Sequence, residues 1–469
     1  MGKSVGTGFV NAGVMLNFAT MDAIRATARA WAALVAVCAL ASAQPQKYKW
    51  GFIDRDGRPA LPIQYVKAES FRNGVAPVVY GKEAGLVDKK GARRGTWRFS
   101  DVNDAGEGLY AVQTGGKWGV IDNNGDEIFG PRYDEILTFS EGFCAVRNGE
   151  SYGFVNRLGY EVTPTKYTRV FPFSEGVAGV VVGKKAALID RTGKELTDFV
   201  FDLGRENPVI AAKNGRVRVQ TDLQWGFLDL EGNVVVEKKY QAAKDFSENV
   251  AAVMDLGKWG LITPDGQCFT GFVFDDVRPC KNGFVAVRKI DKWGFVDKTG
   301  KEVIPPQYDE TSDFEGGVAL VCKDRGCAYI DTLGRAMTTF KFKYRHPDGK
   351  NDPVLQEGLL RAFNGQQWGF IDPQGNEYIP LKYEDAKHFS GGFAAVKFMD
   401  KWGYVDRAGK EVVAFKYDAA FDFKRGFARV ELDGGFTFID KTGRELTPPR
   451  YLKAEDFSEG VAAVAIKAE

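Results

Sequence analysis

Residues 291–310 read DKWGFVDKTGKEVIPPQYDE, in which a Trp-Gly pair precedes an Asp-x-x-Gly turn and a Pro-Tyr ending. The large Trp293 and Phe295 alternate with Gly294 and Val296, which is the period of a half-buried strand. In the Asp-Lys-Thr-Gly that follows, the Asp side chain can accept a backbone hydrogen bond and the Gly can adopt a positive φ. The segment KEVIP then reads as a returning strand that proline ends. The stretch therefore predicts a β-hairpin.

This pattern recurs along the chain at a nearly constant spacing. Intact Trp-Gly copies begin at Trp50, Trp118, Trp225, Trp259, Trp293, Trp368 and Trp402. Degenerate copies begin at Ala84, Tyr152, Ala186, Cys327 and Phe436. Nine of the eleven spacings between these twelve starts are 34 residues. Self-similarity at such a period is the signature of a repeat architecture, in which each repeat is one supersecondary unit.

Positions within a unit are numbered here from its Trp position as zero. Position +15 is aromatic in all twelve units, and position +7 is always glycine, as at Gly57, Gly125, Gly300 and Gly409. A third apolar segment, VALVC at 318–322, follows the quoted stretch. Each unit thus predicts about three short antiparallel strands. Because so small a unit cannot bury enough surface alone, its neighbours must cover its apolar face.

Two global shapes are compatible with such an array. An open β-solenoid or superhelix would place each unit beside the next, and a closed propeller-like ring would also pair the last strand with the first. The first unit begins at Tyr48 without a preceding strand, and the chain ends on a surplus one, GVAAVAIKAE at 460–469. Because twelve three-stranded blades are many for one propeller, we expect an all-β open array, with the closed ring as the alternative.

The N-terminal segment differs from the array at 48–469. Residues 21–43 carry two arginines, an apolar run and an Ala-Ser-Ala ending, which together predict a signal peptide that is cleaved after Ala43. Residues 1–20 resemble neither a signal nor a domain and are expected to be a non-native or unstructured extension. An exported protein in the periplasm or outside the cell is therefore expected.

The repeated Trp-Gly pair in KWGFVDKTGKEVIPPQYDE resembles the WG repeats of a family defined by sequence. The resemblance covers residues 48–469, and twelve copies in phase make it specific. It implies a repeat β-protein, a class found in many bacterial proteins without an established common activity. Five units lack the tryptophan, so a ligand platform built from that residue would be incomplete in those units.

Three further features depart from the repeat. The two longer spacings place insertions near residues 203–214 and 343–357, where loop growth or a partner contact is expected. Cys322 and Cys327 flank the predicted turn KDRG and could form a disulfide across it, with two buried free thiols as the alternative. Cys268 and Cys280 are a less favoured second pair within one unit.

The recurrent polar residues favour structural roles over chemistry. Aspartate occupies position +4 in ten units, with Asn156 and Thr263 in the others, and the replacement by uncharged acceptors favours turn capping over calcium binding. Only His346 and His388 could supply an imidazole, and we find no nucleophile elbow, phosphate-binding loop or paired metal-ligand motif. No catalytic, cofactor-binding or metal-ligating residue is therefore expected.

The sequence indicates an exported, non-enzymatic repeat scaffold that mediates binding to a protein or to a surface polymer. Its net charge of +1 gives no basic field for nucleic acid. The alternative is a carbohydrate or peptidoglycan binder that uses exposed aromatic rings of the repeats. No cofactor and no membrane span after signal cleavage are expected.

Overall fold

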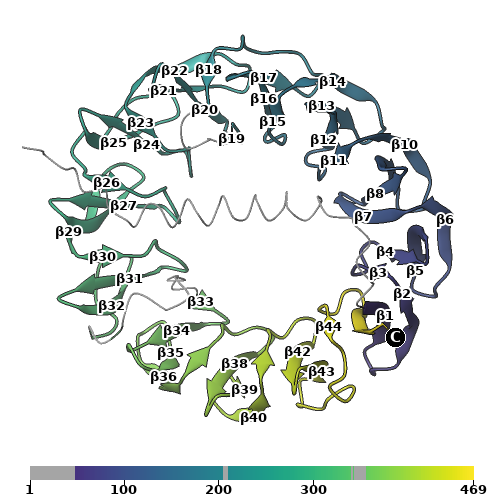
Figure 1. Ribbon diagram of the computed structural model, residues 1–469. Helices are drawn as coiled ribbons and strands as arrows, with labels where there is room; N and C mark the ends of the chain where they lie inside the picture. The colour runs from purple at the N-terminus through teal and green to yellow at the C-terminus, as the bar shows by residue number, and fades with distance from the viewer. Residues whose placement is uncertain (1–47, 204–209, 340–341, 343–354, 469) are drawn as a thin grey trace, which may run out of the picture. The chain divides into compact units, whose positions relative to one another are not determined.

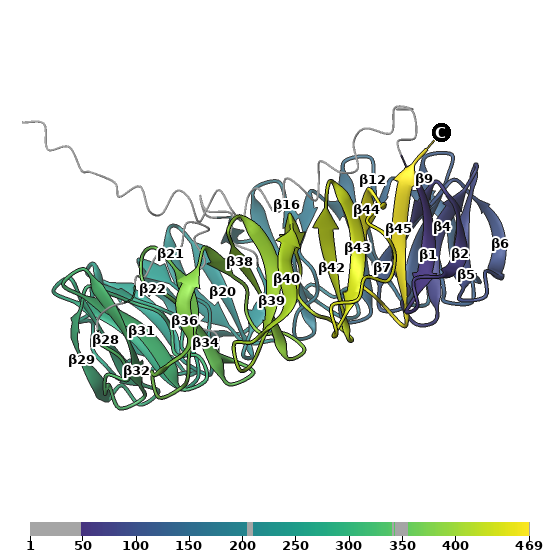
Figure 2. The same cartoon turned by 90° about the horizontal axis from the view of Figure 1, so that it is seen from below.

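The computed structural model describes residues 48–203, 210–339, 342 and 355–468, and the unit that spans 48–469 consists of twelve small antiparallel sheets. Figure 1 shows these sheets arranged as the blades of a ring, and Figure 2 shows the ring from its edge. Short strands such as β11 (Glu135–Ile136) and β15 (Arg169–Val170) lie on the inner side (Figure 1). Nothing helical among these residues has the length and apolar character needed to cross a bilayer.

In each blade the strands follow one another from the inner side of the ring to its outer side (Figure 1). The closing blade contains β44 (Lys453–Ala454), β45 (Val461–Lys467), β1 (Tyr48–Asp54) and β2 (Pro59–Tyr65). The next contains β3 (Lys67–Ala68), β4 (Val75–Tyr80), β5 (Glu83–Asp88) and β6 (Arg93–Phe99). It is followed by β7 (Asp101–Gly106), β8 (Leu109–Thr114), β9 (Lys117–Ile121) and β10 (Glu127–Tyr133). Then come β11, β12 (Phe143–Asn148), β13 (Ser151–Asn156) and β14 (Glu161–Tyr167). The fifth contains β15, β16 (Val177–Val182), β17 (Lys185–Asp190) and β18 (Phe201–Asp202). The sixth contains β19 (Ala212–Lys213), β20 (Arg216–Thr221), β21 (Gln224–Leu228) and β22 (Val234–Tyr240).

The second half of the ring repeats the arrangement. Its first blade contains β23 (Ala242–Ala243), β24 (Ala251–Asp255) and β25 (Lys258–Ile262). The next contains β26 (Asp276–Val277), β27 (Phe284–Lys289), β28 (Lys292–Asp297) and β29 (Glu302–Tyr308). It is followed by β30 (Glu310–Thr311), β31 (Val318–Lys323) and β32 (Gly326–Asp331). Then come β33 (Leu355–Gln356), β34 (Leu359–Phe363), β35 (Trp368–Ile371) and β36 (Glu377–Tyr383). The eleventh blade contains β37 (Asp385–Ala386), β38 (Phe393–Phe398), β39 (Lys401–Asp406) and β40 (Glu411–Tyr417). The twelfth contains β41 (Ala419–Ala420), β42 (Phe427–Leu432) and β43 (Gly435–Asp440).

The ring is closed by the two ends of the repeat array. Strand β45 pairs antiparallel with β1 over seven residue pairs, from Tyr48 with Lys467 to Asp54 with Val461. The expectation of an open solenoid is therefore wrong, and the closed alternative is the observed fold. The surplus C-terminal strand occupies the edge that the first unit leaves unpaired, which removes two exposed sheet edges. The innermost strand of most blades is short, which leaves room for many blades around one ring.

A blade is offset from the sequence repeat. The quoted stretch forms the hairpin β28–β29, but the two strands that complete its sheet, β26 and β27, belong to the preceding unit. Each 34-residue unit therefore connects two blades covalently. This offset gives a physical reason why one unit cannot form a stable sheet without its neighbours.

The glycine of the Trp-Gly pair is required by close backbone approach. A Cβ on Gly294 would collide with the Ile304 carbonyl oxygen on the returning strand, where the β28–β29 register shifts. Gly300 instead supplies the positive φ of 81° that the hairpin turn needs. The main core lies between blades, as in the cluster that joins Phe295 and Tyr308 to Phe314 and Ile330.

Candidate functional site: the inner rim of the ring

The repeated aromatic rings are structural. All twelve rings at position +15 are buried: Tyr65, Phe99, Tyr133, Tyr167, Phe201, Tyr240, Phe274, Tyr308, Phe342, Tyr383, Tyr417 and Tyr451. Trp259 and Trp368 are buried as well, whereas Trp50, Trp118, Trp225, Trp293 and Trp402 are half-buried. Basic side chains cover several of these rings, as Arg278 does at 4.9 Å from the centre of the Trp293 ring. This burial removes the main support for a stripe of sugar-stacking aromatics.

The aspartates at position +4 cap the hairpin turns. Asp297 Oδ1 accepts hydrogen bonds from the Thr299 N–H at 2.8 Å and the Lys301 N–H at 3.1 Å. The Thr299 hydroxyl, also bonded to Oδ1, is the largest cause that lowers the pKa of Asp297, and partial burial opposes it. Asn156 accepts the two equivalent bonds in its own unit. The turn-capping interpretation is confirmed.

A second ladder, at position +23, joins neighbouring blades. Glu141 accepts N–H bonds from Glu175 at 2.6 Å and Gly176 at 2.8 Å in the following blade, and its carboxylate lies 3.1 Å from Arg191 Nη2. Partial burial raises the pKa of Glu141, but these bonds outweigh it and the net shift is downward. We call this contact the glutamate clamp. It also occurs at Glu107, Glu175, Glu248, Glu357 and Glu459.

The glutamate clamp also operates across the ring closure. Glu459 accepts the Gly74 N–H at 3.0 Å and pairs with Lys89 at 3.2 Å, although these residues lie near opposite ends of the array. The Ser458 hydroxyl donates to the Phe71 carbonyl at 2.6 Å, as Ser390 does to Phe423 at 2.7 Å between successive units. The closing seam therefore repeats the contacts of the internal seams.

Asp residues at position +16 form a corresponding ladder at the opposite end of the blades. Asp134 accepts a bond from Lys117 Nζ at 2.7 Å in its preceding blade and from the Gly149 N–H at 2.7 Å in the next blade. The Lys117 bond is the largest cause that lowers the pKa of Asp134. One carboxylate thus connects the turn of one blade to the strand of another.

Six units lack the glutamate of the clamp, and two consecutive ones among them lack an asparagine at that position as well. Position +23 is Gly391 in one unit and Arg425 in the next, whereas every other pair of neighbouring units retains a glutamate or an asparagine in at least one of the two. A cleft of about 880 Å³ lies at this place. Its lining comes from the turns before β4, β38, β42 and β45, so the cleft spans four blades including the closing one.

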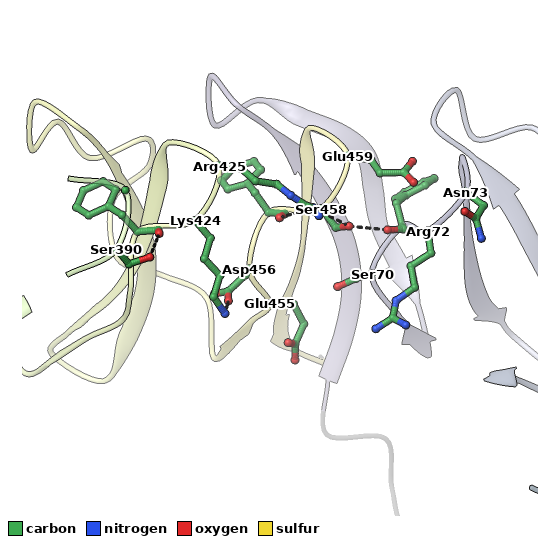
Figure 3. A pocket seen from close by; sticks show the side chains of 14 residues that line it. Ser70, Arg72, Asn73, Ser390, Lys424, Arg425, Glu455, Asp456, Ser458 and Glu459 are labelled. Carbon is green, nitrogen blue, oxygen red and sulfur yellow. Dashed lines mark hydrogen bonds and ion pairs between the residues drawn. The ribbon is translucent and has the colours of Figure 1, made fainter. Parts of the chain in front are cut away.

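Figure 3 shows Lys424 and Arg425 beside Asp456 on one side of this cleft, and Arg72 near Glu459 on the other. Lys424 pairs with Asp456 at 2.8 Å, and this bond is the largest cause that raises the lysine pKa. Arg425 Nη1 donates to the Phe457 carbonyl at 3.2 Å and to Ser458 Oγ at 3.1 Å. A basic residue therefore makes the inter-blade contact where six other units use a carboxylate. The cleft continues toward a second hollow of about 380 Å³ beside Tyr110.

This arrangement suits recognition of a polar, mixed-charge surface. Arg72, Lys424 and Arg425 line the cleft with donors and Glu455, Asp456 and Glu459 with acceptors, several of which are already joined in pairs such as Lys424 with Asp456 that a ligand would share. A nucleophile with an adjacent general base is not among the cleft residues. His388, near the rim, has a pKa lowered to about 4, first by burial and then by the charge of Arg361, so it is neutral at neutral pH.

Several residues singled out in the sequence lie elsewhere or outside the described residues. Cys322 and Cys327 are joined by a disulfide between directly opposed strand positions, at 2.01 Å between their sulfurs. Cys144, Cys268 and Cys280 are free thiols, so the second expected pair is absent. The described residues do not include the segments 1–20 and 21–43, with Ala43. They also leave out 204–209, which is half of the first insertion, and 343–354, which is most of the second and contains His346.

Comparison with known proteins decides the family. The profile of the WG containing repeat matches nine times, at residues 50–82, 118–151, 152–185, 225–259, 259–293, 293–326, 368–402, 402–435 and 436–467. These matches cover more than half of the chain. The chain belongs to the WG containing repeat family. The resemblance of the repeats to WG repeats is thus confirmed. A search of curated proteins finds no match for this WG-repeat protein.

Solved structures resemble the WG-repeat ring only distantly. A eukaryotic initiation factor is 11% identical at a TM-score of 0.36, covering 90% of this chain and 98% of its own. PorZ, a surface component of the type-IX secretion system of Porphyromonas gingivalis, is 10% identical at 0.23, with coverage of 85% and 60%. Hsv2p of Kluyveromyces lactis is 12% identical at 0.26, with coverage of 52% and 98%. Likenesses this weak carry no functional argument.

Proposed function

We propose that this WG-repeat ring is an exported, non-enzymatic scaffold that binds a protein or a surface polymer at the inner-rim cleft. The observation that carries the proposal is the coincidence of the cleft with Gly391 and Arg425, the one pair of neighbouring units in which position +23 is neither glutamate nor asparagine. In six units a glutamate at position +23 holds the turns of neighbouring blades together, whereas the rim at Gly391 and Arg425 has no such carboxylate and borders the cleft. Export is supported by the leader-like segment at 21–43.

Site-specific photo-crosslinking tests this proposal. A photoreactive side chain in place of Lys424 is expected to capture a partner in producing cells, and the same group at Tyr378, which is 52% exposed on outer strand β36, is the matched control. Co-sedimentation of the purified protein with peptidoglycan sacculi separates a polymer partner from a protein partner. If the photoreactive groups at Lys424 and Tyr378 capture partners equally, and the protein does not sediment with the sacculi, binding at the cleft is contradicted.

Substitution at the clamp position provides a second test. Arg425→Glu is expected to restore the inter-blade clamp and to abolish crosslinking from Lys424, while the ring stays folded. Glu431→Arg, a change of similar size on neighbouring strand β42, controls for altered charge. Unchanged capture by Arg425→Glu would exclude Arg425 from the binding surface.

A further inference from the structure

Three consecutive blades present large aliphatic side chains to solvent at the same hairpin. Leu223 between β20 and β21 is 76% exposed, Leu256 between β24 and β25 is 89% exposed, and Ile290 between β27 and β28 is 83% exposed. These hairpins lie at the opposite end of the blades from the turns that line the rim cleft, because the intervening strand runs from one end to the other. We call Leu223, Leu256 and Ile290 the apolar tips.

The backbone at the apolar tips is unfavourable for such residues. Their φ angles are 65°, 46° and 50°, in the left-handed region that suits Gly and Asn. A β-branched isoleucine is especially disfavoured there. Other blades place Gly81, Gly149 or Gly183 at the position of Leu256 and Ile290, and Leu223 lies one residue later in its hairpin. The fold therefore does not need aliphatic residues at this position, and both the strain and the exposure call for a functional explanation.

The charges around the apolar tips identify the chemistry of an occupant. Carboxylates of Asp222, Asp255 and Asp291 belong to the three hairpins themselves. Two lysines of these hairpins, Lys258 and Lys292, are neutralised by ion pairs with Asp275 and Asp309. Lys289 is the one further lysine of these hairpins. The surface is thus aliphatic with an acidic border, which disfavours anionic lipid headgroups and nucleic acid.

We propose that the apolar tips dock a cationic amphipathic segment of a protein partner. Aliphatic side chains of the segment would contact Leu223, Leu256 and Ile290, and its lysine or arginine side chains would meet the hairpin carboxylates. This surface is distinct from the rim cleft, so the two sites can be tested separately. The WG-repeat ring would then hold partners at both ends of its blades.

The test compares the wild type with the triple variant Leu223→Asn, Leu256→Asn and Ile290→Asn. Asparagine tolerates the left-handed conformation, so the variant is expected to fold and to melt at a higher temperature than the wild type. The probe is a fluorescent peptide of alternating leucine and lysine, whose binding is followed by anisotropy. The triple variant is expected to lose at least tenfold in affinity for the peptide. The control is Leu333→Asn, which replaces a 65% exposed leucine in a turn at the opposite end of the blades, and it is expected to bind the peptide normally.

Two parallel probes and one variant make the result decisive. A leucine-glutamate peptide and vesicles of phosphatidylcholine with phosphatidylglycerol are expected not to bind. Equal affinity of wild type and triple variant, no binding of the leucine-lysine peptide, equal binding of the acidic peptide, or vesicle binding that depends on the apolar tips would each overturn the proposal. Arg425→Glu is expected to leave peptide affinity unchanged, so failure here and failure at the rim cleft are distinguishable.

Discussion

Removal of one glutamate clamp is expected to weaken the whole ring measurably. The side chain of Glu141 is 30% exposed, and its carboxylate accepts two N–H bonds from the next blade. A hydrogen bond to a charged group contributes about 1.5–3 kcal/mol when sheltered, and partial exposure of both turns allows water to replace about half of it. Glu141→Ala is therefore expected to lower the free energy of unfolding by about 2 kcal/mol.

Urea unfolding followed by tryptophan fluorescence measures this change. Glu150→Ala, an exposed glutamate in the hairpin between β12 and β13, is the matched control and is expected to change stability by less than about 0.5 kcal/mol. Glu141→Gln keeps one acceptor oxygen and is expected to fall between the two. If Glu141→Ala differs no more than its control does, the clamp contributes nothing and the argument for inter-blade carboxylates fails.

The pH dependence of the same variants adds an independent check. The folded-state pKa of Glu141 is lowered, so its contribution is present above the unfolded pKa near 4.3 and is lost as pH falls through the folded value. The stability difference between Glu141→Ala and the wild type is therefore expected to shrink below about pH 4. A difference that stays constant with pH would show that the effect arises from packing and not from the carboxylate.

Further predictions concern the other carboxylates, the disulfide and the leader. Because the pKa values of Asp297 and Glu248 are also lowered, the wild type is expected to lose stability as pH falls below about 4.5, with no comparable loss between pH 6 and 8 in a urea series. Reduction of the bond between Cys322 and Cys327 is expected to lower the free energy of unfolding by about 2 kcal/mol, and a variant with both cysteines changed to alanine should not respond to reductant. In a secreting host, N-terminal sequencing of the mature protein is expected to begin at Gln44, and retention of Ala43 would contradict the leader.

Much of the local structure follows from sequence patterns. Strand β28 was expected to be half-buried, but Phe295 packs against the following blade and Val296 against the preceding one, so β28 is buried on both faces. Asp297 and Gly300 form the turn because their chemistry satisfies it within a few residues. The turn caps are local interactions, so a short window of sequence contains everything that determines them.

The inter-blade ladders could not be assigned from the same patterns. Glutamate recurs at position +23, but its partners, the amides one unit later, are main-chain groups that carry no residue-specific signal. The recurrence itself, and its loss at Gly391 and Arg425, is the signal that could have located the rim cleft. The apolar tips were missed for a related reason, since exposure of Ile290 and its left-handed φ are tertiary facts.

By itself the sequence determined the repeat, its strands, its turns and its family, because all of these depend on short-range patterns present in twelve copies. Only the tertiary structure decided between an open array and a ring. That choice depends on whether the small rotation between neighbouring blades brings β45 beside β1, and the rotation is a sum of many inter-blade contacts that no single unit specifies. Once closed, the same contacts that join neighbours also join the first unit to the last, as Glu459 and Gly74 show.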